Sequence, residues 1–275
     1  MTEGQWTDSR SKENQLSETK WMKTTLMEKA STEKASMENK LTAAHLEDRV
    51  TEKKGALAVT LADERVWLLP ERAVWWPATR TVFVADVHLG KAASFRALGQ
   101  PVPSGTTRDN LDRLSALIDG LSAARLVVLG DFLHAAAAQQ AQVLDPAQDW
   151  RDRHPALACL LIRGNHDSHA GDPPPSLRFE IVDEPHPMGP FAACHHPQRV
   201  DGAYVLAGHL HPATTLHGRA HERHRLPCFA ESEGLMILPA FGAFTGTTQA
   251  GLPEGSRCHA VGGGAVWPAP YARSA

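Results

Sequence analysis

Leu126-Val-Val-Leu-Gly-Asp131 is one of five short apolar runs in this chain that each end in residues able to bind a metal. The other four are Val82-Phe-Val-Ala-Asp86-Val-His88, Leu160-Leu-Ile-Arg-Gly-Asn165-His166-Asp167, Phe191-Ala-Ala-Cys-His195-His196 and Tyr204-Val-Leu-Ala-Gly-His209-Leu-His211. Such runs, rich in Val, Leu and Ile, predict strands that are buried on both faces. In open α/β sheets, ligands bind beyond the carboxyl ends of the strands. The five runs therefore predict one binding site at a sheet edge.

Composition divides the chain near Lys54 and Gly55. Residues 1–54 hold eight of the nine lysines and four of the six methionines, with ten basic and ten acidic side chains and few aliphatic ones. Such a segment cannot bury enough apolar surface to offset its ordering entropy. We expect residues 1–54 to be a polar extension, disordered or loosely helical, with a partner-binding helix or a mis-assigned start codon as alternatives. Residues 55–275 are expected to form one domain.

Several classes of protein are disfavoured by the rest of the composition. The four cysteines are widely spaced and form no C-x-x-C pair, so we expect them to be reduced and buried rather than paired or bound to zinc. No signal peptide or membrane span is apparent, which predicts a cytoplasmic protein without a membrane partner. The net charge of −3 does not by itself indicate a nucleic-acid binder.

The order of elements predicts an α/β protein. Short strands at residues 57–61, 66–69 and 73–76 form an antiparallel lead-in, and a loop is expected over residues 90–105. Apolar residues at helical spacing predict a helix over Thr106–Leu121, capped by Ser104 or Thr106. A second helix is expected between Ala135 and Arg153, because Pro155 prevents its continuation. With further strands after residue 191, these elements give a mixed sheet with helices outside.

The polar residues at the strand ends offer seven nitrogen and oxygen donors and no sulfur. They are Asp86, His88, Asp131, Asn165, His195, His209 and His211. Asp131 has two carboxylate oxygens and could bridge two cations. Seven donors shared by two ions leave open coordination positions, which suit catalysis rather than a structural role. Either His195 or His196 could be the ligand from its pair, and we choose His195 because it directly follows the strand.

The ordered series D-x-H, G-D, G-N-H-D, H and G-H-x-H resembles the calcineurin-like metallophosphoesterase superfamily over roughly residues 80–212. The resemblance implies a four-layer α/β/β/α sandwich with mixed sheets and two divalent metal ions. By this likeness the first metal is held by Asp86, His88, Asp131 and His211. The second is held by Asp131, Asn165, His195 and His209. A metal-bridging hydroxide would then attack a phosphoester in line.

Flanking segments are similar to a narrower family, the bacterial ligase-associated DNA damage response endonucleases. These segments are Gly90-Lys-Ala-Ala-Ser-Phe-Arg96, Pro101-Val-Pro-Ser-Gly-Thr-Thr107, Gly130-Asp-Phe-Leu-His134, Arg225-Leu-Pro-Cys-Phe229 and Leu238-Pro-Ala-Phe-Gly-Ala-Phe-Thr-Gly246. The likeness implies a manganese-dependent endonuclease that acts on single-stranded DNA in repair, in functional association with a DNA ligase and a helicase. The donor chemistry alone is equally compatible with iron, zinc or mixed occupancy.

The two residues that follow Asn165, together with Arg163 before it, are expected to act in catalysis. We expect His166 to project toward the substrate and to protonate the leaving oxygen, with Asp167 orienting its ring.

Arg163 resembles a phosphate-contacting arginine, and the alternative is an ion pair that holds the loop. Lys91 and Arg96 follow the first metal motif and are expected to bind substrate phosphates, with solvated loop charges as the alternative. His134 is expected to be an ordinary surface or outer-shell residue.

Two other functions compete with a DNA endonuclease. The same dinuclear centre could serve a small-molecule or cyclic-nucleotide phosphodiesterase or phosphatase, which would need a lidded pocket rather than an open groove. A non-catalytic binding scaffold with this architecture would be expected to have lost several metal ligands. All seven positions are filled here, so the sequence favours an enzyme.

Overall fold

The computed structural model describes residues 55–97, 99–102, 105–217, 222–243, 245–248 and 251–268. The chain divides into two units, residues 1–46 and 47–275, and all described residues belong to the second. The predicted extension over residues 1–54 lies outside the described residues and stays a prediction.

The first sheet has seven strands in chain order, β1 to β7. They are β1 Leu57–Leu61, β2 Glu64–Leu69, β3 Ala73–Trp76, β4 Thr81–Val84, β5 Arg125–Leu129, β6 Ala158–Ile162 and β7 Phe179–Val182. Strands β1 to β4 are antiparallel, as predicted for the lead-in, and β4 to β7 are parallel. Because β4, β5 and β6 run in the same direction, their carboxyl ends lie at one edge of the sheet.

The second sheet has the order β15-β14-β12-β13-β10-β9-β8, with β11 paired to β12. Its strands are β8 His186–Met188, β9 Phe191–Ala193, β10 Tyr204–Ala207, β11 Ala213–His217, β12 Arg223–Ser232, β13 Leu235–Ile237, β14 Arg257–Gly262 and β15 Ala265–Pro268. Strand β10 is parallel to β9 and β13, and the other pairs are antiparallel. Both sheets are therefore mixed.

In the described part of the chain there are four α-helices and one four-residue 3-10 helix, with two shorter 3-10 turns. They are α2 Lys91–Ala97, α3 Thr106–Leu121, η2 Ala136–Gln139, α4 Ala141–Arg153 and α5 Asn165–Ala170, beside the single turns η1 Pro77–Thr79 and η3 Pro175–Leu177. The bounds of α3 agree with the prediction, and the second predicted helix is divided into η2 and α4. No helix within the described ranges is long and apolar enough to span a bilayer.

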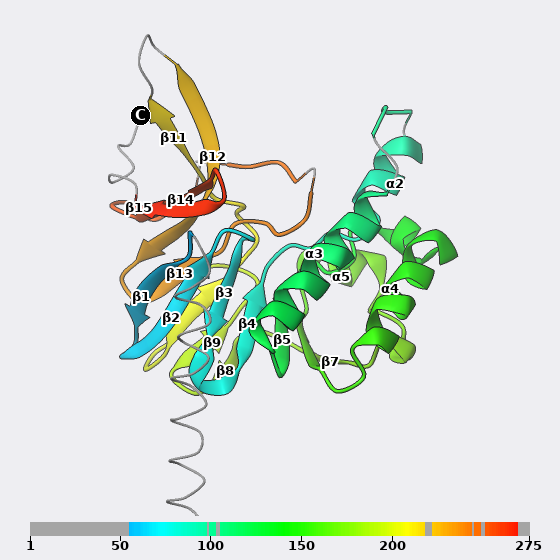
Figure 1. The fold of residues 1–275 in the computed structure, drawn as a ribbon, viewed down its shortest axis with the longest axis horizontal. Coiled ribbons are helices and arrows are strands. Elements are labelled where there is room, and N and C mark those ends of the chain that lie inside the picture. Colours follow the sequence, from blue (N-terminus) through cyan, green and yellow to red (C-terminus); the bar gives the residue numbers. More distant parts are fainter. Residues whose placement is uncertain are drawn as a thin grey trace, which may run out of the picture. The chain divides into compact units, whose positions relative to one another are not determined.

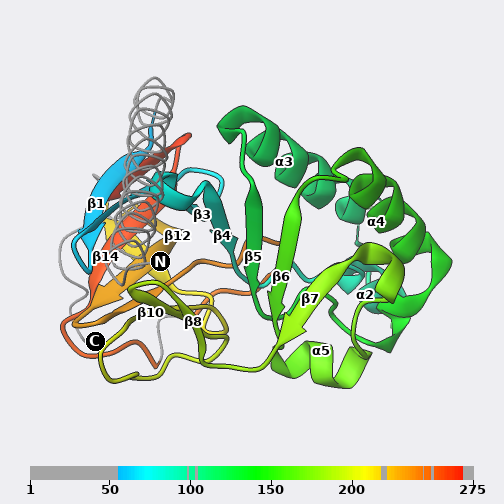
Figure 2. The same ribbon diagram turned by 90° about the horizontal axis from the view of Figure 1, so that it is seen from below.

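Helices α3 and α4 cover one face of the first sheet, and the second sheet lies against the other (Figures 1 and 2). Trp75 and Trp76 point to opposite faces, yet both are buried, at 0% and 6% exposure. Trp75 joins the core beneath the helices and Trp76 the core between the sheets. Because the sheet is covered on both faces, neither ring is exposed.

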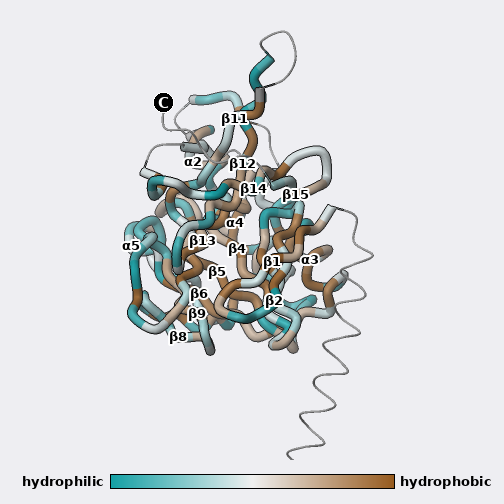
Figure 3. The backbone as a smooth tube through the Cα atoms, turned by 90° about the vertical axis from the view of Figure 1, so that its left-hand side faces the viewer, coloured by the Kyte–Doolittle hydropathy of each residue, from teal (hydrophilic) through white to brown (hydrophobic). Residues whose placement is uncertain are grey.

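The core between the sheets is aromatic at its centre. The ring of Phe191 lies edge-on to Trp76, at 5.0 Å between centroids, and to Phe83, at 6.4 Å. Such contacts add stabilisation beyond the burial of area. In Figure 3 the hydrophobic colour follows central strands such as β4 and β5. The packing of the two sheets brings the ends of β4, β5 and β6 next to those of β9 and β10.

Two local features differ from the sequence predictions. The expected loop over residues 90–105 contains helix α2, a short helix whose seven residues carry little periodic signal. Helix α3 begins after Gly105, which has a left-handed φ of 95° and no side-chain cap, so Thr106 is not the cap; Ser104 lies outside the described residues. Within the described residues no helix follows Leu177, and loop residues such as Val200 and Leu252 pack on the outer face of the second sheet.

All four cysteines are buried and free, as predicted from their spacing.

Candidate metal centre

The predicted metal ligands lie where the five strands end, and their backbones are held in an uncommon conformation. Five of the seven have a left-handed φ between 47° and 67°. They are Asp86, His88, Asp131, His209 and His211. This region is sparsely populated by residues other than glycine, and it persists only where the surrounding structure enforces it. The loops are fixed partly by each other, since Asp86 N donates to Gly130 O at 3.2 Å and His88 N donates to Asp131 O at 2.9 Å.

Glycines before the ligands leave room for the neighbouring side chains. A Cβ atom on Gly130 would lie 2.0 Å from His195 Nδ1, and one on Gly164 would lie 2.2 Å from Asp131 Oδ1. Both distances are far below van der Waals contact. The G-D and G-N pairs of the sequence are therefore needed for close approach of one loop to the next.

The first group of donors consists of Asp86, His88 and His211. Asp86 and His88 are buried, at 0% and 2% exposure, and His211 Nε2 lies 3.3 Å from Asp86 Oδ1 without hydrogen-bond geometry. Asp86 Oδ1, His88 Nε2 and His211 Nε2 all lack a hydrogen-bond partner. Buried polar atoms are rarely left unpaired. Three unpaired donor atoms in one group fit a divalent cation.

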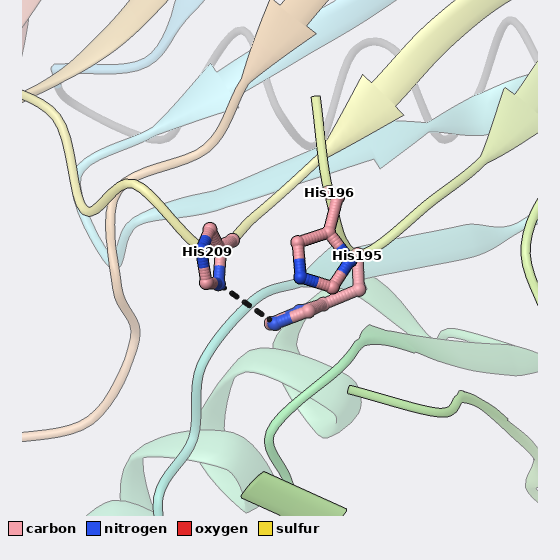
Figure 4. A group of neighbouring side chains, drawn as sticks. All are labelled: His195, His196 and His209. Carbon is pink, nitrogen blue, oxygen red and sulfur yellow. Dashed lines mark hydrogen bonds between the residues drawn. The ribbon is translucent and has the colours of Figure 1, made fainter. Parts of the chain in front are cut away.

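The second group consists of Asp131, Asn165, His195 and His209. His195 Nε2 lies 2.9 Å from Asn165 Oδ1 and 3.6 Å from Asp131 Oδ1. His209 Nδ1 lies 3.1 Å from His195 Nε2, and Figure 4 shows the two rings directed toward each other. Nitrogen and oxygen donors from β5, β6, β9 and β10 thus converge at one point.

Asp131 lies between the two groups. Its Oδ2 is 3.9 Å from His88 Nε2, and its Oδ1 is 3.6 Å from His195 Nε2. One carboxylate oxygen therefore faces each group, which is the arrangement that a bridging ligand of two cations needs. Burial, together with the neighbouring Asp86, raises the pKa of Asp131, and bound cations would relieve this.

Two imidazoles of the centre, those of His88 and His209, have lowered pKa values. Burial lowers the pKa of His88, and Lys91 and the surrounding histidines lower it further. Burial also lowers the pKa of His209, with His195 as the next cause. Because metals bind the neutral imidazole, these shifts favour metal binding over protonation.

His166 is placed by a residue that we had not assigned to the site. His166 Nδ1 lies 2.8 Å from the carbonyl oxygen of His134, and the two rings stack at 4.7 Å. The ring of His134 is also 5.0 Å from that of His88. An N–H at Nδ1 donates to the carbonyl, which leaves the lone pair on Nε2. His134 follows Asp131 by three residues in one loop, and this spacing was the available signal.

Asp167 does not orient His166, and that prediction is wrong. Its carboxylate instead accepts backbone N–H groups from Asp131 at 2.7 Å, Leu133 at 3.0 Å and Gly164 at 3.0 Å. Asp167 lies in the first turn of α5, so its side chain turns back toward the loops that carry the metal ligands. Asp167 therefore holds these loops together and does not hold the imidazole of His166.

Arg163 is engaged in ion pairs, as the alternative reading proposed. Its Nε and Nη2 donate to the two oxygens of Asp172 at 3.0 and 2.9 Å, and its Nη1 donates to Asp183. These carboxylates raise the pKa of the guanidinium. Because both edges of its planar group are occupied, the predicted roles of Arg163 in catalysis and phosphate binding have no support in the geometry.

The two basic residues of α2 differ in their surroundings. Lys91 begins the helix and is half-buried; burial lowers its pKa, whereas the nearby carboxylates of Asp86 and Asp131 oppose this. Its ammonium group is thus within electrostatic reach of the metal centre. Arg96 lies in the last turn of α2 and is exposed. The helix thus begins with Lys91 near the site and has the exposed Arg96 in its last turn.

We predict that Asp167→Ala destabilises the protein by about 3 kcal/mol or more, because it leaves three buried N–H groups without an acceptor. Urea unfolding of the metal-free protein measures this. Asp145→Ala, an exposed change in α4, is the control and is expected to alter stability by no more than about 0.5 kcal/mol. Equal effects of the two substitutions would contradict the assigned role.

Comparisons with known proteins identify the family of the chain. Residues 79–201 match the family model of the calcineurin-like phosphoesterases. The chain is 43% identical to nuclease MPE of Pseudomonas putida, with a TM-score of 0.69, over 78% of this chain and 100% of that one. A protein of unknown function from Aquifex aeolicus is 16% identical, with a TM-score of 0.32, over 51% and 80% of the two chains, a likeness too weak to argue from. No curated protein matches. The chain belongs to the calcineurin-like phosphoesterases, a family of metal-dependent hydrolases.

Proposed function

We propose that this protein is a metal-dependent endonuclease that cuts single-stranded DNA in DNA repair. The observation that carries the proposal is the position of Asp131. Its two carboxylate oxygens each face one of the two groups of candidate metal ligands. The 43% identity to a nuclease supports DNA as the substrate. Manganese as the metal and the association with a DNA ligase and a helicase rest on the sequence resemblance. A cytoplasmic location stays a prediction from the sequence.

Two divalent cations would be held on either side of Asp131. Asp86, His88 and His211 complete the first position, and Asn165, His195 and His209 complete the second. Bound cations supply positive charge for the phosphate oxygens and lower the pKa of coordinated water. The buried, unpaired donor atoms described above are consistent with this assignment.

We assign His166 as the group that protonates the leaving oxygen. The carbonyl oxygen of His134 accepts the N–H of Nδ1, so Nε2 is the atom left to face a substrate. Nε2 carries the proton to be transferred when the ring is an imidazolium, in which both nitrogens bear hydrogen. The side chain of His166 is 39% exposed, which gives a substrate access to it. His134 stacks on the ring and acts as a positioning residue.

Lys91 is the residue that we expect to contact the DNA backbone. It is the only lysine in residues 55–275, and its charge lies beside the carboxylates of the centre. A phosphodiester bound at the centre would pass within its reach. Arg96 lies on the same helix and would contact phosphates farther along the strand.

The proposal is tested with circular single-stranded DNA, which has no ends. We expect the full-length protein to linearise the circle when manganese is added, and Asp131→Ala to be inactive because both metal positions lose a ligand. Gel electrophoresis measures the products. Failure to cut the circle, together with metal-dependent hydrolysis of a small chromogenic phosphodiester, would assign the protein to the small-molecule alternative.

Replacing His166 with Asn is predicted to lower the rate of DNA cleavage by about 100-fold to 10,000-fold, the range that general acid catalysis supplies. The bound metal is expected to be unchanged, because the side chain of His166 is not among the expected ligands. Single-turnover cleavage and elemental analysis of the same samples measure the two quantities. Cleavage at the full rate with normal metal content would remove His166 from the mechanism.

Lys91→Ala is predicted to weaken binding to single-stranded DNA of every sequence by a similar factor. The plot of log affinity against log salt should flatten by about 0.7, the value for one phosphate contact on a single strand. Fluorescence anisotropy at several salt concentrations measures the slope. Arg153→Ala is the control, since Arg153 pairs with Asp112 on the helical side of the first sheet. An unchanged slope in Lys91→Ala would contradict the contact.

A further inference from the structure

The carboxylate of Glu184 binds the His195-His196 pair through three contacts. Its Oε2 accepts the backbone N–H groups of His195 at 2.7 Å and His196 at 2.8 Å. Its Oε1 lies 2.6 Å from His196 Nδ1. A carboxylate only accepts hydrogen bonds, so Nδ1 of His196 carries the proton. The lone pair of His196 is therefore on Nε2.

The ring of His196 lies beside the second donor group. Its centroid is 4.4 Å from that of His209 and 4.7 Å from that of His195. One potential ligand atom from each of His195, His196 and His209 lies within 4.8 Å of the others. Figure 4 shows the ring of His196 beside the hydrogen bond between His195 and His209, which is drawn as a dashed line.

The second metal position has room for a further donor. Asp131, Asn165, His195 and His209 supply four donors, whereas manganese and related cations accept up to six. The side chain of His196 is 46% exposed, so it approaches from the solvent side of the group. A histidine that binds a metal commonly donates its other ring N–H to a carboxylate. His196 has this arrangement, because its Nδ1–H donates to Glu184 and its Nε2 is left to bind a metal.

We propose that His196 is an additional ligand of the second metal position and that Glu184 is the carboxylate that orients it. This inference rests on the proposed function, because it requires the dinuclear centre. It adds a third imidazole to the second position, which the ligand set expected from the sequence does not contain. The first position keeps only His88 and His211. Glu184 thus contributes twice, by fixing the backbone of His195 and by directing the ring of His196.

Binding of manganese to the full-length, metal-free protein tests the inference. Isothermal titration calorimetry of the unsubstituted protein should show two sites. His196→Ala is expected to weaken one site about 10-fold or more and to leave the other unchanged. Glu184→Gln should weaken the same site by about 10-fold to 100-fold, as the loss of an outer partner does. His224→Ala, an exposed histidine on β12, is the matched control and should change neither site.

The visible spectrum of bound cobalt gives a second readout that is independent of activity. Loss of an imidazole from the coordination sphere should shift the absorption bands in His196→Ala but not in His224→Ala. Thermal unfolding of the metal-free variants verifies that each is folded. If His196→Ala were unfolded, Glu184→Gln would carry the test, because a glutamine oxygen can still accept the two backbone N–H groups.

Three results would overturn the inference. Two sites of unchanged affinity and an unchanged cobalt spectrum in both variants would overturn it and leave the proposed function intact. Unchanged metal binding with weakened binding of inorganic phosphate would show that His196 contacts the substrate phosphate instead. An unsubstituted protein that binds no manganese would overturn the inference and the proposed function together.

Discussion

Two carboxylates, Asp86 and Asp131, are buried within one site where the two sheets meet, and most features of the site follow from this. Their exposures are 0% and 1%. A buried charge is costly unless it is paired or hydrogen-bonded. The chain provides only part of the compensation, since His209 N donates to Asp86 Oδ2 at 3.0 Å and His166 N donates to Asp131 Oδ1 at 2.9 Å. Bound cations would offset the remaining negative charge, and the surrounding imidazoles would complete their coordination.

The geometry of this site depends on the packing of the sheets as much as on its own residues. Asp86, Asp131 and Asn165 follow strands of the first sheet, whereas the imidazoles of His195 and His209 follow strands of the second. Contacts such as that of Phe191 with Trp76 hold the two sheets in register. Small shifts between the sheets would separate oxygen donors from nitrogen donors, so the core between the sheets serves catalysis as well as stability.

The strands and the main helix could be predicted because their signals are local. Fully buried strands such as β5 appear as continuous apolar runs, and α3 has apolar residues at helical spacing. The donors that meet at the centre could be predicted because each follows a strand. Helix α2 was missed because seven residues beside a glycine give too short a pattern.

Side-chain direction could not be predicted in the same way. Asp167 adjoins His166 in sequence, yet the first turn of α5 turns its carboxylate toward three backbone N–H groups. Arg163 pairs with Asp172, which lies in the loop after α5, and with Asp183, which follows β7. Such contacts depend on loops that the tertiary structure places, and no short-range pattern encodes them.

The order of the strands has a consequence for the assembly of the protein during synthesis. Every neighbour in the first sheet is also a neighbour along the chain, whereas β12 in the second sheet pairs with both β13 and β14 before the sheet closes on β15. Contacts between near neighbours in sequence form with the smallest loss of chain entropy. The oxygen donors therefore emerge from the ribosome on a sheet that can form first, and the imidazoles of residues 195–211 are added afterwards. A firmly held metal would therefore require that strands of both sheets have formed.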